Sequence, residues 1–112
     1  MVTDKLKLLA NAMQAYTWRT QATASNLANL DTPGYERMSV KFEESLQNAL
    51  NTVDGSHALA NVRPHMEVED APPVLEDELM ELADTQMRTQ LASRALREHF
   101  DALRTGITGH SG

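Results

Sequence analysis

Apolar residues recur at intervals of three and four in two long stretches, one toward each end of the chain. In residues 3–30 the recurring positions are Leu6, Leu9, Met13, Tyr16, Thr20, Thr23, Leu27 and Leu30. In residues 75–105 they are Leu79, Leu82, Gln86, Thr89, Ser93, Leu96, Phe100 and Leu103. This heptad spacing predicts one long helix in each stretch. Both seams are apolar at their ends and polar in the middle, where a stable coiled coil would carry Leu or Ile.

Charges support the second helix. Asp77, Glu78 and Glu81 lie near its start, where the helix dipole favours anions. Asp84 and Arg88 are four residues apart in the favourable order. A second face of this helix carries Met80, Ala83, Met87 and Leu91. Gly106 and Gly109 are expected to end it.

The first helix runs into a Pro-Gly pair. Pro33 has no N–H and a fixed φ, so a helix cannot continue through it. Gly34 supplies the positive φ that the third position of a type II turn needs. The sequence therefore predicts a sharp turn directly after the first helix.

The middle, residues 35–74, has weaker patterns. Phe42, Leu46, Ala49 and Leu50 indicate a short amphipathic helix over residues 40–50. Residues 51–56 are rich in turn formers, and residues 62–70 are compatible with one short extended segment. Pro72 and Pro73 exclude a helix just before the last stretch. We expect this middle to be mobile or irregular.

These patterns predict an all-α protein in which two long terminal helices form a coiled-coil-like hairpin, joined by a short, partly irregular middle segment. We expect an N-terminal helix and turn in residues 1–34, the middle in 35–74, and a C-terminal helix and flexible tail in 75–112. The two terminal helices would form one discontinuous domain. Their polar centres leave two interpretations open: a weakly packed hairpin, or helices whose faces are completed by neighbouring copies in a tube.

Composition narrows the function. A chain of 112 residues is at most one modest domain. Its net charge of −6 argues against a nucleic-acid partner. It has no cysteine and therefore no disulfide or thiolate metal site. It has no apolar run long enough to cross a bilayer and no conventional secretory signal, which by itself favours a cytoplasmic protein.

The sequence offers no set of residues for catalysis. His57, His65, His99 and His110 form no metal-binding pair four residues apart, and the loop histidines are expected to be exposed. The eight acidic residues between Pro64 and Met87 do not match a calcium loop and indicate a solvated acidic face. A phosphate-binding loop and a nucleophile elbow are both absent. We predict no catalytic, cofactor-binding or metal-binding residues and no enzyme activity.

One sequence motif is more specific than is needed to end a helix and make a turn. It comprises Asn26, Ala28, Asn29, Asp31, Thr32, Pro33, Gly34 and Tyr35, with Phe42 after the turn. It resembles the signature of the flagellar basal-body rod protein family, and is most similar to that of the family's proximal-rod members. Residues 78–90 and 103–107 are similar to that family's C-terminal helix. The chain departs from the pattern at Lys41, Thr89 and Gly106, and Pro72-Pro73-Val74 replaces the usual Gly-Asn run.

The resemblance implies a structural, non-enzymatic subunit whose terminal helices pair and stack with those of neighbours to transmit torque. It implies export by the flagellar type III apparatus into the periplasm, without a cleaved signal peptide, and a place in the basal body. The implied partners are copies of the chain, other rod proteins, the rod-base adaptor, the export gate and the membrane ring.

Two sets of residues are the candidates for this role. The turn set is Asn26, Asn29, Asp31, Thr32, Pro33, Gly34 and Tyr35. The assembly seam is Leu6, Leu9, Met13, Leu27, Leu79, Leu82, Leu96, Phe100 and Leu103. Another rod protein of the same family is one alternative. A cytoplasmic helical-hairpin adaptor or export chaperone is a second, since a missing signal peptide and acidic charge suit it equally well.

Overall fold

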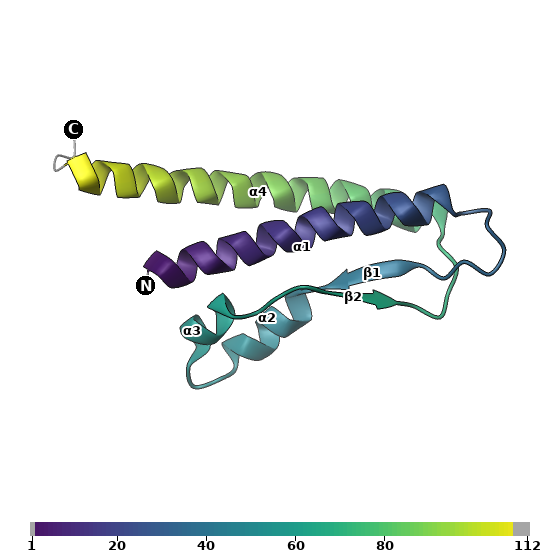
Figure 1. Cartoon of the computed structure of the whole chain (residues 1–112), viewed down its shortest axis with the longest axis horizontal. Helices are drawn as coiled ribbons and strands as arrows, with labels where there is room; N and C mark the ends of the chain where they lie inside the picture. Colours follow the sequence, from purple (N-terminus) through teal and green to yellow (C-terminus); the bar gives the residue numbers. More distant parts are fainter. Residues whose placement is uncertain (1, 109–112) are drawn as a thin grey trace.

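The computed structural model describes residues 2–108 of the chain, which form an elongated molecule of 60 × 33 × 15 Å. The elements follow in the order α1 (Val2–Ala28), β1 (Met38–Lys41), α2 (Glu43–Leu50), α3 (Gly55–Ala60), β2 (His65–Val68) and α4 (Leu75–Thr108). Figure 1 shows α1 between two layers, with α4 along one side and the middle elements along the other. The long helices run antiparallel, as expected for a hairpin.

Both long helices were predicted correctly. α1 ends at Ala28, two residues before the expected boundary, and α4 begins at the expected Leu75. α4 continues through Gly106, so the prediction that this glycine ends the helix was wrong. The other expected stop, Gly109, lies outside the described residues. No described helix is long and apolar enough to cross a membrane.

The predicted type II turn is confirmed. The Tyr35 N–H donates to the Thr32 carbonyl at 3.2 Å, and Gly34 between them has a φ of +77°. The turn is joined to α1 by Asn29, whose side chain donates to the Ser25 carbonyl and accepts from the Thr32 hydroxyl. The chain therefore reverses immediately after the helix.

The middle segment contains two helices and two strands, whereas the sequence predicted a mostly irregular middle. β1 and β2 pair antiparallel, with Met38 opposite Val68 and Lys41 opposite His65. α2 lies within the helix predicted over residues 40–50, but Val40 and Lys41 form the end of β1 instead of the start of that helix. β2 lies within the predicted extended segment, and α3 was not predicted. The fold is thus mostly α with a two-stranded sheet, and not all-α.

The buried core lies mainly between α1 and the middle segment. Ala12, Ala15 and Ala22 of α1 are buried with Val40 and Phe42. Phe42 is only 1% exposed and is the largest fully buried side chain among the described residues. Small side chains on α1 let the strand approach closely, which explains how so few large residues build a core.

Candidate functional site

The motif residue Asn26 joins α1, β1 and α4. Its side chain is fully buried and binds both backbone groups of Met38, donating to the carbonyl and accepting from the N–H at 2.8 Å each. The same amide donates to Glu78 at 2.8 Å, and the Tyr35 hydroxyl donates to its oxygen at 3.3 Å. We call Asn26, Tyr35, Arg37, Met38 and Glu78 the Asn26 clamp.

A buried carboxylate completes the clamp. Glu78 is 0% exposed and accepts from Arg37 Nε at 2.9 Å and from Arg37 Nη2 at 3.3 Å. Arg37 also donates to Glu69 at 2.7 Å. The hydrogen bond to Glu78 raises the pKa of the Arg37 guanidinium, against the opposing effect of burial. Arg37 thereby ties the start of the sheet to the first turn of α4.

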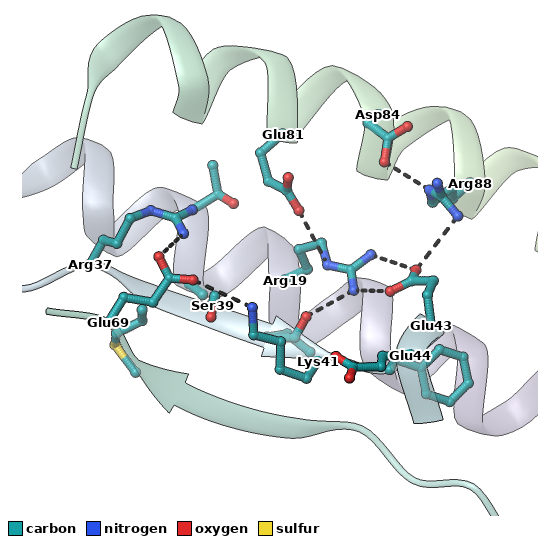
Figure 2. Close-up of a pocket in the computed structure, with 15 residues that line it drawn as sticks. Arg19, Arg37, Ser39, Lys41, Glu43, Glu44, Glu69, Glu81, Asp84 and Arg88 are labelled. Carbon is teal, nitrogen blue, oxygen red and sulfur yellow. Dashed lines mark hydrogen bonds and ion pairs between the residues drawn. The ribbon is translucent and has the colours of Figure 1, made fainter. Parts of the chain in front are cut away.

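A second cluster lies farther along the same interface, centred on Arg19 of α1. This buried guanidinium donates to the Val40 carbonyl at 2.9 Å, pairs with Glu43 at 2.7 Å and lies 3.3 Å from Glu81 (Figure 2). Burial acts to lower the pKa of Arg19, but the hydrogen bond and charge of Glu43, with the charge of Glu81, outweigh it and raise the pKa. Arg88 of α4 pairs with Asp84 and reaches Glu43 at 3.6 Å.

A cleft of about 360 Å³ lies between β1, the start of α2 and α4. Figure 2 shows its charged side chains pointing toward one another across it. Most of them are held in ion pairs: Arg19, Arg37, Lys41 and Arg88 with Glu43, Glu69, Glu81 and Asp84. Paired charges of this kind hold the surrounding helices and strands in place relative to one another. Within the described residues no cluster of His, Asp or Glu is arranged to hold a metal.

These ion pairs make stability depend on pH. The hydrogen bond from Arg37 lowers the pKa of the Glu69 carboxyl. Burial acts to raise the pKa of Glu43, but hydrogen bonds from Arg19 and the backbone, with the charges of Arg19 and Arg88, outweigh it and lower the pKa. The folded chain therefore binds fewer protons than the unfolded chain, and this stabilisation is present above the ordinary glutamate pKa of about 4.3. We expect the urea midpoint to fall as pH drops below that value. Glu69→Gln should show a shallower fall, and an equally steep one would contradict this assignment.

The turn set divides into two groups. Asn26 and Tyr35 belong to the clamp, and Asn29 and Thr32 hold the turn. Asp31, Pro33 and Gly34 are exposed. The main structural role of the turn set is therefore to end α1 and to fix the start of β1.

Gly34→Val tests the turn directly. A Cβ at this position meets nothing within 4 Å, so the cost comes from the positive φ alone. We expect the free energy of unfolding to fall by about 1 kcal/mol or more. Gly34→Asn should lose less, because Asn tolerates the left-handed region. Urea unfolding checks both, and equal stability of the Val variant would show that the turn tolerates an ordinary φ.

The assembly seam is partly buried. Leu6, Leu9, Met13 and Leu27 of α1 and Leu82, Leu96 and Leu103 of α4 are all of intermediate exposure. Leu79 and Phe100 are 49% and 50% exposed. Four residues of α4 are buried instead: Glu78, Thr85, Ala92 and His99. Each lies one residue before a position of the predicted heptad spacing, namely Leu79, Gln86, Ser93 and Phe100. Three of these four are polar, which explains why an apolar pattern did not identify them.

The second face predicted for α4 is unpartnered. Met80, Met87 and Leu91 are 71%, 61% and 56% exposed, and Ala83 is exposed between them. Their spacing places them together on one side of the helix, largely opposite the side that carries Glu78 and Thr85. We call these four residues the α4 stripe. A row of large apolar side chains in water is typical of a surface that a protein partner covers.

Several residues of the site were missed from the sequence. Glu69, Glu78 and Glu81 were assigned to a solvated acidic face, but Glu78 is buried and the other two are ion-paired. One signal did exist: Arg19 occupies the same helical face as Ala12, Ala15, Ala22 and Asn26. A guanidinium on a stripe of small residues indicates a buried partner. His57 and His65 are exposed as expected, His99 is buried, and His110 lies outside the described residues.

Residues 6–35 match the sequence model of a known family, the flagella basal body rod proteins. The matched residues are most of α1 and the whole type II turn, including every residue of the turn set. No curated protein and no solved structure gives a significant match to the chain. The family match supports a structural role in the rod and a place in the flagellar basal body.

Proposed function

We propose that this chain is a structural subunit of the flagellar basal-body rod, of the proximal type, that assembles with copies of itself and with other axial proteins to transmit torque. The observation that carries the proposal is the family match over residues 6–35. In the structure this segment is the central helix α1, in contact with α4 and the sheet, together with the turn that leaves it. Asp31 before the Thr-Pro-Gly string is the feature that favours the proximal subtype.

The α4 stripe is the surface that we assign to assembly. In the single chain its methionines and Leu91 are exposed to water, and burying them against a neighbouring helix would be favourable. Methionine side chains adapt to irregular surfaces, which suits contacts with non-identical rod neighbours. Leu79 and Phe100 of the assembly seam are exposed enough to contribute from the flanks of the same helix.

The turn and the Asn26 clamp have a complementary role. They fix where α1 ends and return the chain along α1, so that the sheet, α2 and α3 lie on one side of it (Figure 1). The terminal helices, which we regard as one discontinuous domain, keep the α4 stripe clear of the middle segment. Neighbouring copies could then stack along the helices without obstruction.

The partners that follow from this role are other rod proteins, the rod-base adaptor, the export gate and the membrane ring. The chain would reach the periplasm through the flagellar type III apparatus without a cleaved signal peptide. Fractionation tests this in matched strains with an active and an inactivated export gate. We expect the chain in basal bodies of the first strain and only in the cytoplasm of the second.

The same exposed stripe favours one other function, a cytoplasmic adaptor or export chaperone that covers a partner helix. Such a protein would remain in the cytoplasm of both strains and would be absent from basal bodies. A chain found in the cytoplasm regardless of the export gate would therefore replace the rod proposal with the adaptor.

A further inference from the structure

The two strands of the sheet differ in how their outer edges are covered. Along β1, the side chains of α1 replace a third strand. Asn26 binds both backbone groups of Met38, and Arg19 donates to the carbonyl of Val40. The edge of β1 that faces α1 is thus occupied by side chains, and its other edge pairs with β2.

The outer edge of β2 has no such cover. The Glu69 N–H donates to the Arg37 carbonyl, so the backbone N–H and C=O groups of Glu69 point toward β1. Backbone groups of successive residues point to opposite sides of a strand. The backbone groups of Met66 and Val68 therefore point away from β1. Among the described elements β2 pairs with β1 alone, and Figure 1 shows no element beside its outer edge. All four residues of β2 are exposed, with Val68 at 64%.

β2 is short, but its outer edge carries no lysine and no proline within the strand, two common protections against pairing with another chain. Exposed edges are commonly guarded by lysine, by proline within the strand or by a covering loop. Here the prolines, Pro64 and Pro72, lie outside the strand, and the side chains on the face shared by Met66 and Val68 are apolar. The prolines also limit any added pairing to a short segment between them.

Charge indicates what kind of segment fits. Glu67 and Asp70 are exposed, and residues 64–87 contain no lysine or arginine. Glu67 lies 3.8 Å from His65 Nε2, which is a cation only when the histidine is protonated. A two-fold pairing of two copies that used both Met66 and Val68 would set Glu67 directly against the same carboxylate of the second copy. Like charges directly opposite each other destabilise a strand pair, whereas a basic residue opposite Glu67 would stabilise it.

We propose that the outer edge of β2 receives an extended segment of a partner protein, in which apolar residues alternate with basic ones, as a third strand. The apolar residues would pack beside Met66 and Val68, and a basic residue would face Glu67. Main-chain hydrogen bonds to Met66 and Val68 would hold the strand, and the alternating side chains would select it. This surface is separate from the α4 stripe and does not depend on the rod function.

The test is a titration of the isotope-labelled full chain with a capped peptide of alternating valine and lysine, followed by NMR. We expect the amides of Met66 and Val68 to shift and to gain protection from hydrogen exchange. Val68→Pro removes one outward N–H without disturbing the pairing with β1, and should weaken binding about five-fold. Val68→Thr retains that N–H and should bind as the parent does.

A charge reversal gives a second, independent readout. Glu67→Lys should weaken binding of the valine–lysine peptide, whereas Glu98→Lys, an equal change of charge at an exposed position of α4, should not. Unprotected amides in β2, or equal binding by the Val68→Pro variant, would overturn strand addition. Protection of Met66 and Val68 that grows with protein concentration, without peptide, would identify a second copy as the occupant and overturn the partner assignment.

Discussion

Replacing Asn26 with Ala is expected to lower the free energy of unfolding by about 3 kcal/mol or more. The amide satisfies the N–H and carbonyl of Met38 and one oxygen of Glu78, all at 2.8 Å. Removing it leaves several buried polar groups without partners, each of which carries a desolvation cost of about 1–3 kcal/mol. A chain of this size has little stability in reserve, so a loss of that magnitude would populate unfolded forms.

Urea unfolding of the full chain measures the effect, with Asn29→Ala as the matched control. Asn29 is only three residues away, but its side chain bonds locally, to Ser25 and Thr32, so we expect a loss of about 1 kcal/mol or less. Asn26→Asp should also be destabilising, because a carboxylate cannot donate to the Met38 carbonyl and would face Glu78. Equal losses for the Asn26→Ala and Asn29→Ala variants would show that the clamp adds nothing beyond a helix-end contact.

Met87→Asp is expected to abolish motility and incorporation into basal bodies while leaving the isolated chain as stable as the parent. Met87 is 61% exposed, so a carboxylate there stays hydrated in the single chain. In an assembly that covers the α4 stripe, the same carboxylate would have to be buried without a partner, at a cost of several kcal/mol. A cost of that size would reduce incorporation by more than a hundred-fold.

Gln86→Asp is the control for this prediction. It introduces the same charge at the adjacent exposed position of α4, on a different side of the helix, and should leave motility intact. Soft-agar swimming and the protein content of basal bodies check both variants. Normal motility of the Met87→Asp variant would remove the α4 stripe from the assembly surface.

The features that were predicted correctly depend on local sequence. The three-four spacing in α1 and α4 gives each helix its own apolar side, and Pro33-Gly34 determines the turn through the φ preferences of those two residues. Neither needs information from elsewhere in the chain. The short strands are different, because β1 and β2 are only four residues each and are separated by two helices. The outer edge of β1 is satisfied by hydrogen bonds from the side chains of Asn26 and Arg19 on α1. No pattern within either strand reveals these long-range contacts.

The register of α4 shows a second limit. A search for apolar residues favours Leu79 and Phe100, whereas the side of the helix that packs against α1 carries Glu78, Thr85, Ala92 and His99. Small and polar side chains allow close approach between helices, and Glu78 is matched there by Arg37 and Asn26. Thr85 Oγ1 and His99 Nε2, by contrast, are buried without a hydrogen-bond partner among the described residues. The larger residues are thereby left on the outside of the helix, where we propose that assembly uses them.

Only the part of the candidate site that depends on local sequence was predicted. Asn26 was identified within the turn set because it belongs to a recognisable string. Its partners Met38 and Glu78 were not, since they are 12 and 52 residues away and follow no periodicity. Glu78 was instead explained by helix-start electrostatics, which its position in the first turn of α4 also satisfies.

The most direct test of the account is quantitative mass spectrometry of purified hook–basal bodies, with this chain measured against the other rod subunits. The account predicts a small and fixed number of copies for each basal body, retained after washing and absent when the export gate is inactive. Basal bodies that lack the chain, from cells in which the protein is abundant in the cytoplasm, would contradict it.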